Sequence, residues 1–323
     1  MPDSQDRDPS EVSFRPNLFI VGAPKSGTTS LHHYLANHPD ISMSIIKEPC
    51  FLAPDFQSIN YPQSEDEYLK CFEKPNGQKY IGEATSTYLY SQKAAQTIHD
   101  YSSDAKIIAM LRNPVQLVAS LHAQRLKEGD ENLRDLKDAL DAEEARRHGK
   151  NIPLRFVYPY QYLLYRDYGQ YSSQLKRYFN TFGRENVHVI IFDDFAANSQ
   201  ESVAGVCRFL GLSNLENIDA KTHNPAQLPR FLFIHRTIVV LTRVIMFMGH
   251  RFKAYLPKLV VKTLWGSYVK TTSFIRRKNL VQGRQELKDS VKRELSEHFK
   301  TEIEQLEQLL DRDLSIWKSA NAS

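Results

Sequence analysis

Cysteine is scarce in this sequence of 323 residues, and it follows no pattern. The three cysteines, Cys50, Cys71 and Cys207, are widely spaced, and none belongs to a CxxC pair. An odd number at such spacing favours neither a disulfide framework nor a zinc site, and it fits a reducing compartment best. Residues Met1–Val12 also lack a basic region followed by an apolar one. We therefore expect a disordered tail over 1–14, no signal peptide and a cytoplasmic protein.

Acidic residues are absent from one long segment, although the net charge of the chain is only +4. Residues 220–285 hold 13 Lys or Arg and no Asp or Glu, whereas the chain before them holds 23 basic and 29 acidic residues. Such segregation indicates an anionic partner, whether phosphate, a polyanion or a membrane surface. A solvated basic face is the plainer alternative.

Long uninterrupted apolar runs are missing as well. The stretch Phe231–Met248 is broken by His235, Arg236 and Arg243, which argues against a transmembrane helix. It could lie on an anionic membrane as a peripheral contact, or hold an anionic glycan or lipid. A helical lid over the sheet, whose aromatic residues are core, is at least as good an interpretation.

Short apolar, β-branched runs alternate with helical patterns along the chain, in a composition typical of a soluble globular protein. The runs are Asn17–Val21, Lys79–Gly82, Lys106–Leu111 and Val187–Phe192. This alternation predicts an α/β fold with a P-loop-like parallel sheet and helices on both faces. We expect one domain over 15–323 with a C-terminal helical extension, in which 220–285 forms a lid or an acceptor region.

Three helices are predicted with some detail. Asn113 and Pro114 form an N-cap and first turn for a helix over Val115–Lys127. The segment Glu131–Arg147 is charged nearly all round, which predicts a surface helix with ion pairs. Apolar residues recur at helical spacing over Gln285–Leu310, so this helix should dock on the body.

The loop Gly22–Thr29 follows the first predicted strand and precedes a helix. Its glycines have Walker A spacing, but Thr28 stands where the Walker A lysine would be, and Lys25 lies inside the loop. The glycines let the backbone fold tightly, its N–H groups and the helix N-terminus attract an anion, and the lysine can reach the bridging oxygen of a leaving group. A βα turn without a ligand is the plain alternative, which the lysine and two hydroxyl residues make less probable.

This Lys-Ser-Gly-Thr-Thr pattern resembles that of the sulfotransferases that use 3′-phosphoadenylyl sulfate (PAPS). Arg112 ends an apolar strand, Asn-Pro follows, and Ser120 comes eight positions after the arginine, as in the 3′-phosphate site of that family. The resemblance implies that these two residues bind the 3′-phosphate, and an arginine at the carboxyl end of a strand suits that task. The residues expected to hold the 5′-phosphosulfate are Lys25, Ser26, Gly27, Thr28 and Thr29.

Lys47-Glu48-Pro49 places the likeness in the glycan and heparan-type branch and its bacterial relatives, which use a glutamate at this place as catalytic base. The resemblance extends to about Trp317 and is weakest over 220–285. Glu48, flanked by apolar residues, is expected to be partly desolvated, which would raise its pKa, while a neighbouring lysine would oppose that rise. A surface residue paired with Lys47 is the alternative.

Other candidate bases rank lower. His32 and His33 lie within the first helix and His38 at its end, where packing roles are commoner. Glu83 follows a predicted strand and could line the acceptor site, with no chemistry beyond positioning.

The resemblance implies in-line transfer of the sulfuryl group from PAPS to an acceptor hydroxyl on a carbohydrate or glycolipid, leaving adenosine 3′,5′-bisphosphate (PAP). We expect no metal, because a sulfuryl group bears less charge than a phosphoryl group and the sequence shows no ligand cluster. Arg277 and Lys278 could close over the 3′-phosphate. Acceptor selectivity is expected in 57–68, 131–160 and 220–285.

Two rival functions stay open. A P-loop kinase or NTPase is suggested by the apolar run that ends in Asp193 and Asp194, but the Gly-Lys-Ser/Thr order is absent, and these aspartates could cap a helix that begins near Phe195. The second rival is a membrane- or polyanion-binding module centred on the basic segment. Nucleic-acid binding is set aside, since no recognition helix or RNP-like pattern is present.

Overall fold

The computed structural model describes residues 14–154, 156–216, 218, 227–229, 280–282 and 287–318. The chain divides into two compact units, Met1–Arg112 with Tyr171–His223 and Asn113–Gln170 with Asn224–Ser323. Residues 1–13 of the predicted tail and nearly all of the basic segment 220–285 lie outside the described residues. The single domain over 15–323 stays a prediction. None of the described helices is long and apolar enough to cross a membrane.

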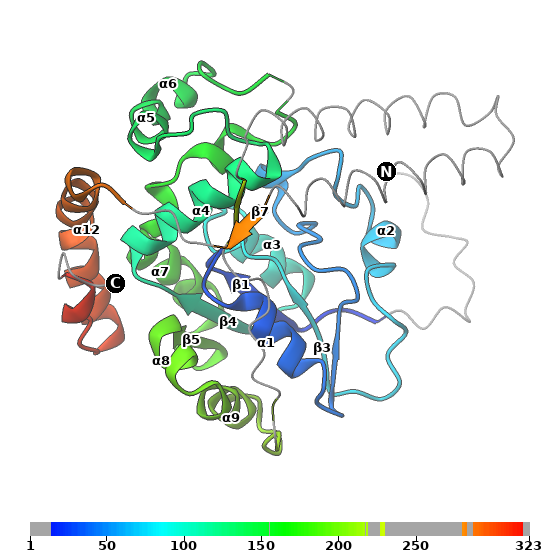
Figure 1. The fold of residues 1–323 in the computed structure, drawn as a ribbon. Helices are drawn as coiled ribbons and strands as arrows, with labels where there is room; N and C mark the ends of the chain where they lie inside the picture. The colour runs from blue at the N-terminus through cyan, green and yellow to red at the C-terminus, as the bar shows by residue number, and fades with distance from the viewer. Residues whose placement is uncertain are drawn as a thin grey trace, which may run out of the picture. The chain divides into compact units, whose positions relative to one another are not determined.

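The first unit is built on a five-stranded sheet whose strands all run parallel, in the order β2-β3-β1-β4-β5 (Figure 1). The strands are β1 (Leu18–Gly22), β2 (Ile41–Met43), β3 (Tyr80–Ala84), β4 (Lys106–Leu111) and β5 (Val187–Ile191). The predicted α/β fold with a parallel sheet is therefore confirmed, and the four apolar runs match strands to within two residues at each end.

Both faces of this sheet are buried. Leu18 and Ile20 of β1 belong to a hydrophobic cluster that also contains residues of α1 (Thr28–Leu35), α8 (Phe192–Ala197) and α9 (Ser199–Leu210). Phe19 and Val21 alternate with them, so they point to the opposite face, and they are equally without exposed surface. A strand buried on both faces reads as a continuous apolar run, which is why the sequence predicted it well.

The helices of the first unit fall into two groups. Figure 1 shows α1, α8 and α9 side by side, and α9 contacts both of the others. The helices α3 (Ala94–Tyr101) and α7 (Tyr171–Phe182) contact each other instead. The shorter helices of this unit are η1 (Pro54–Phe56), α2 (Glu65–Leu69) and η4 (Arg184–Asn186).

Strand β1 occupies the point at which the order of the sheet reverses. From β1 the chain forms β2 and β3 on one side and then β4 and β5 on the other. Open α/β sheets bind ligands at the carboxyl ends of their strands beside such a switch point. The topology therefore singles out the residues that follow β1 and β4.

The second unit begins with the helix α4 (Pro114–Glu128). The side chain of Asn113 accepts a hydrogen bond of 2.9 Å from the amide of Val115, and Pro114 occupies the first turn, as predicted. The other elements are α5 (Leu136–Asp141), α6 (Glu143–Arg147), η2 (Tyr160–Leu163), η3 (Asp167–Gly169), β6 (Gln227–Pro229), β7 (Leu280–Gln282), α12 (Asp289–Leu310) and η5 (Ser315–Trp317). The strands β6 and β7 pair antiparallel.

The prediction of a single surface helix over Glu131–Arg147 is wrong. The segment holds two short helices, and Glu131 precedes both of them. The side chains of Glu131 and Arg146 have no exposed surface and form an ion pair of 2.9 Å, while the hydroxyl of Tyr165 donates to Glu131 at 2.7 Å. Against the cost of burial, the hydrogen bond from Arg146 lowers the pKa of Glu131. A buried ion pair uses the charges that the sequence pattern assigned to solvent.

The predicted C-terminal helix is present as α12, although it begins at Asp289 and not at residue 285. It contacts α4 of the same unit. The predicted apolar stripe is buried at Val291, Leu295, Phe299, Ile303 and Leu306.

Candidate active site

The loop between β1 and α1 has a backbone that only particular residues can adopt. Gly22 has a φ of +147°, and a Cβ atom there would lie 2.7 Å from the carbonyl oxygen of Ser86. Gly27, with a φ of +91°, forms the N-cap of α1 without any side-chain cap. Lys25 has a φ of 63° although it carries a side chain. Left-handed backbone at a non-glycine residue is concentrated at functional sites, where the surrounding structure enforces it.

The hydroxyl residues of this loop differ in exposure. Ser26 has no exposed surface, and its hydroxyl donates to the carbonyl of Pro24 at 3.4 Å, so its side chain supports the loop. Thr28 is buried, whereas Lys25 and Thr29 are half-buried. The first-turn N–H groups of a helix have no partner within the helix, and with the helix dipole they attract anions. The loop can therefore hold a phosphate or sulfate group mainly through its backbone and Lys25.

Arg112 follows β4 and meets this loop directly. Its Nη1 atom donates to the carbonyl of Lys25 at 3.1 Å. The guanidinium lies 4.8 Å from the ring centroid of Phe192, and the hydroxyl of Tyr171 donates to the Arg112 carbonyl at 2.9 Å. The two segments that the sequence predicted to bind phosphate are thus joined at the switch point of the sheet.

Ser120 belongs to the second unit, on the helix α4, where it is half-buried. Arg112 is the last residue of the first part of the other unit. A shared 3′-phosphate site for Arg112 and Ser120 therefore stays a prediction.

Glu48 is held beside the start of the same loop. Its carboxylate accepts hydrogen bonds from the amide of Ser86 at 2.7 Å and from the hydroxyl of Ser86 at 2.9 and 3.1 Å. It also pairs with Lys47, and 36% of its side chain is exposed. Its amide donates to the carbonyl of Ala84 at 2.9 Å, and its φ is 61°. Glu48 therefore pairs with Lys47, as the alternative interpretation of the sequence had it, and its carboxylate is partly exposed and firmly oriented.

Ser86 links the base candidate to the loop, which sequence reasoning did not foresee. Its N–H and hydroxyl hold Glu48, while its carbonyl oxygen lies against Gly22. The turn that contains it is fixed to β1, because the amide of Leu89 donates to Val21 at 2.7 Å and that of Thr85 donates to Ile20 at 3.1 Å. No sequence signal marks a serine in such a role.

Glu83 does not line an acceptor site, contrary to expectation, because it is completely buried. Burial raises its pKa to about 7, against the lowering effect of hydrogen bonds from Thr85, Tyr68 and Tyr88. A carboxyl group at the end of a buried strand can be ionised only at a cost, which these three donors reduce.

The histidines occupy packing positions or the surface. His32 is buried with Nε2 at 3.0 Å from the Ser44 carbonyl, and burial lowers its pKa to about 4. His38 is buried with Nε2 at 3.0 Å from the Ser213 carbonyl, and His33 is exposed. His32 and His38 thus have the packing roles that the sequence favoured, and their lower rank as bases stays a prediction.

Asp193 and Asp194, which the sequence suggested as helix caps or as magnesium ligands, lie inside helix α8 and not before it. Helix α8 begins at Phe192, so its N-cap is Ile191, and Asp193 and Asp194 are exposed in the first turn. Carboxylates there interact favourably with the helix dipole. In the described part of the chain, no three His, Cys, Asp or Glu side chains gather as metal ligands would.

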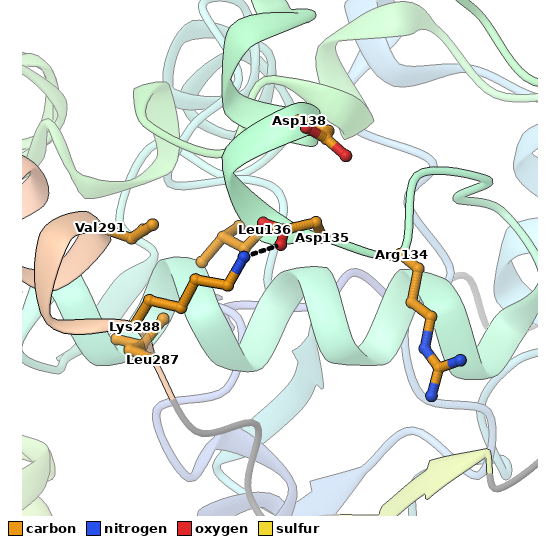
Figure 2. A pocket seen from close by; sticks show the side chains of 7 residues that line it. All are labelled: Arg134, Asp135, Leu136, Asp138, Leu287, Lys288 and Val291. Atoms are coloured by element: carbon orange, nitrogen blue, oxygen red, sulfur yellow. Dashed lines mark hydrogen bonds and ion pairs between the residues drawn. The ribbon is translucent and has the colours of Figure 1, made fainter.

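A groove of about 380 Å³ lies in the second unit, between the start of α5 and the start of α12 (Figure 2). Lys288 reaches across it to pair with Asp135, which caps α5. The residues that line it are Arg134, Asp135, Leu136, Asp138, Leu287, Lys288 and Val291. None of them was predicted to bind the donor, although four lie within 131–160, where acceptor selectivity was expected.

Comparison with known proteins gives consistent results. The family model described as "Sulfotransferase domain" matches residues 15–225. The crystal structure of a sulfotransferase from Alicyclobacillus acidocaldarius superposes with a TM-score of 0.67 at 30% identity, covering 95% of this chain and 100% of that one.

Two curated relatives are longer proteins. Mouse "Carbohydrate sulfotransferase 15" is 26% identical over 254 residues, covering 62% of this chain and 44% of the relative. Human "Bifunctional heparan sulfate N-deacetylase/N-sulfotransferase 2" is 24% identical over 208 residues, covering 62% of this chain and 22% of the relative. The chain thus spans less than half the length of these relatives.

Proposed function

The chain belongs to the sulfotransferase domain family, and from this premise we propose that it transfers the sulfuryl group of PAPS to an acceptor hydroxyl with Glu48 as general base. The observation that carries the proposal is the position of Ser86. Its amide donates to the Glu48 carboxylate at 2.7 Å, and its carbonyl oxygen lies against Gly22 at the start of the loop Gly22–Thr29. A base and a donor site that share one supporting residue can act on the same transferred group.

In this proposal the 5′-phosphosulfate of PAPS lies against the loop Gly22–Thr29, here called the donor loop. The backbone of Lys25–Thr29 and the N-terminus of α1 bind its oxygens, and the ammonium of Lys25 faces the bridging oxygen. Arg112, whose Nη1 bonds the loop at Lys25, binds the 3′-phosphate together with Ser120. An anion at each end of the ribose distinguishes PAPS from ATP, which has no 3′-phosphate.

The transfer balances as one displacement at sulfur. The acceptor oxygen forms a bond to sulfur as the bond from sulfur to the 5′-phosphate oxygen breaks, and the bonding pair leaves with PAP. The acceptor proton passes to Glu48, and Lys25 stabilises the charge on the departing oxygen. Ser86 orients the Glu48 carboxylate and Lys47 pairs with it, and because a carboxylate has about four acceptor positions, capacity remains for the acceptor O–H. This displacement requires no metal.

We further propose a carbohydrate or glycolipid acceptor. The support is the likeness to the mouse carbohydrate sulfotransferase and the human heparan sulfate N-sulfotransferase. A "Membrane-associated sulfotransferase kil1" from Dictyostelium discoideum is 38% identical over 104 residues, covering 31% of this chain and 21% of that protein. It supports a peripheral contact with an anionic membrane as part of the same proposal.

Calorimetry with PAP tests the donor site. Wild-type protein should bind PAP, and Lys25→Ala and Arg112→Ala should each weaken binding by about 10- to 150-fold, since a hydrogen bond to a charged group contributes about 1.5–3 kcal/mol. Lys74→Ala, at an exposed lysine of the same unit, is the control and should bind normally. Failure of the wild type to bind PAP would remove the donor assignment, and magnesium-dependent hydrolysis of ATP would favour a kinase or NTPase instead.

The base is tested by sulfate transfer from PAPS to unsulfated heparosan, chondroitin and an alkyl glycoside. Glu48→Gln keeps the shape and the bond from Ser86 but cannot take up a proton, so kcat should fall at least about 100-fold with normal PAP affinity. Transfer by Glu48→Gln at the wild-type rate would show that the base lies elsewhere.

A further inference from the structure

The buried carboxyl group of Glu83 collects three hydroxyl donors. Thr85 donates to Oε2 at 2.6 Å, while Tyr68 and Tyr88 donate to Oε1 at 2.7 and 3.0 Å. All four side chains lie within the first unit and are buried. Glu83 itself has no exposed surface, so it cannot touch a substrate.

Two of these hydroxyls extend the network to the segment that carries Glu48. The amide of Cys50 donates to the hydroxyl oxygen of Thr85 at 3.3 Å, and the amide of Leu52 donates to that of Tyr88 at 3.0 Å. The segment has no helix or strand, so its backbone N–H groups need partners of this kind. The segment is also conformationally demanding, because Glu48 and Cys50 both have left-handed backbone, with φ of 61° and 53°.

The direction of these bonds depends on the carboxyl group. A hydroxyl has a single proton, and when it donates that proton to Glu83 its lone pairs are left to accept an amide N–H. Thr85 and Tyr88 therefore act as relays between Glu83 and the amides of Cys50 and Leu52.

Tyr68 provides an internal comparison. Its hydroxyl donates to the same Oε1 atom as that of Tyr88, but it meets the segment through its ring, which stacks on Phe51 with centroids 4.7 Å apart. Removal of the Tyr68 hydroxyl takes a donor from Glu83 without taking an acceptor from the segment.

We propose that Glu83 is a positioning residue, which orients the hydroxyls of Thr85 and Tyr88 so that they fix the segment 48–52 and aim Glu48 at the acceptor. This inference rests on the proposed role of Glu48 as the base. It assigns to the two hydroxyls that Glu83 orients an effect on turnover that a purely structural network would not have.

The test compares Thr85→Val, Tyr88→Phe and Tyr68→Phe, each of which removes one hydroxyl donor of Glu83 and keeps most of the side-chain volume. Thr85→Val and Tyr88→Phe should lower kcat by about 10- to 100-fold, the range that misplacement of a catalytic group produces. The KM for PAPS and the affinity for PAP should stay within about twofold of wild type, because the donor loop is untouched. Tyr68→Phe should keep the wild-type kcat. Thr85→Ser retains the hydroxyl that Thr85→Val removes, so it should also keep the wild-type kcat.

Heparosan is the acceptor probe, and hydrogen exchange of a peptide that spans 48–52 gives a readout that needs no acceptor. Exchange there should accelerate in Thr85→Val and Tyr88→Phe and not in Tyr68→Phe. The inference is overturned if all three variants lose kcat equally, or if kcat and exchange stay at wild-type values in Thr85→Val and Tyr88→Phe. The two failures are distinguishable, since an active Glu48→Gln variant, or a wild type that binds no PAP, contradicts the proposed function.

Discussion

Two buried groups of the first unit make opposite contributions to the pH dependence of stability. A variant that lacks one of them should therefore show the pH dependence of the other. Burial raises the pKa of Glu83 from 4.5 to about 7, against the hydrogen bonds from its three hydroxyl donors. Burial lowers the pKa of His32 from 6.5 to about 4, and the charge of Lys47 acts in the same direction. The geometry supports both pKa shifts, since Glu83 is fully enclosed and the Nε2 atom of the buried His32 lies in hydrogen-bond contact with the Ser44 carbonyl.

The signs follow from proton binding in the folded and unfolded chains. Folded protein keeps a proton on Glu83 up to about pH 7, whereas the unfolded chain releases it near pH 4.5, so this contribution is complete at low pH and is lost as the pH rises through that window. The unfolded chain protonates His32 near pH 6.5 and the folded protein only near pH 4, so stability is lost as the pH falls between them. Each window corresponds to about 3 kcal/mol, and the two slopes oppose each other between about pH 4.5 and 6.5.

Urea unfolding of Glu83→Gln and His32→Gln across about pH 4.5–8 measures both contributions. Relative to wild type, Glu83→Gln should gain about 3 kcal/mol of unfolding free energy as the pH rises through this range. His32→Gln should lose up to about 3 kcal/mol relative to wild type as the pH rises from about 4.5 to 6.5. For the double variant, the difference in unfolding free energy from wild type should change little between about pH 4.5 and 6.5, because the two trends cancel there. A free-energy difference between Glu83→Gln and wild type that is independent of pH would refute the assignment of a raised pKa to Glu83.

Two further predictions concern the donor loop and the second unit. Gly27→Ala should abolish PAP binding in calorimetry, because a Cβ atom there lies at 3.2 Å from Met110 and 3.3 Å from Phe192 at a φ of +91°, whereas Gly77→Ala, with a φ of +83° and open space around it, should bind normally. Arg146→Met should lower the unfolding free energy in urea by about 3–5 kcal/mol, since it leaves the Glu131 carboxylate buried without its cation. Adding Glu131→Gln should recover much of that loss, and no recovery would contradict the argument.

The parts of the fold that the sequence predicted are those in which local pattern and tertiary role agree. β1 and β4 are buried on both faces, so their composition alone marks them as strands of a covered sheet. Asn113 and Pro114 begin α4 through local chemistry that needs no tertiary partner. The loop Gly22–Thr29 was recognised as a tight turn for a similar reason, because Gly22 and Gly27 have the positive φ angles that favour glycine.

The parts that the sequence did not predict depend on partners far along the chain. Glu131 finds Arg146 fifteen residues later and Tyr165 thirty-four residues later, and neither spacing follows a helical or strand period. Glu83 is similar, because its hydroxyl donor Tyr68 comes from a different element. Residue type alone does not distinguish a glutamate that is buried among such partners from one in solvent. Because charged residues are mostly exposed, the sequence pattern favoured exposure in both cases.

The same reasoning explains why the turn after β3 is so important to the candidate site. Thr85, Ser86 and Tyr88 each bond a different part of the segment 48–52, and Ser86 also lies against Gly22 of the donor loop. The amides of Thr85 and Leu89 fix this turn to β1, the strand from which the donor loop emerges. The turn after β3 thus contacts both the segment that carries Glu48 and the start of the loop Gly22–Thr29, which relates the two without the partly exposed pairing of Glu48 with Lys47. Because an ion pair at that exposure contributes little to order, the orientation of the Glu48 carboxylate comes mainly from the turn itself.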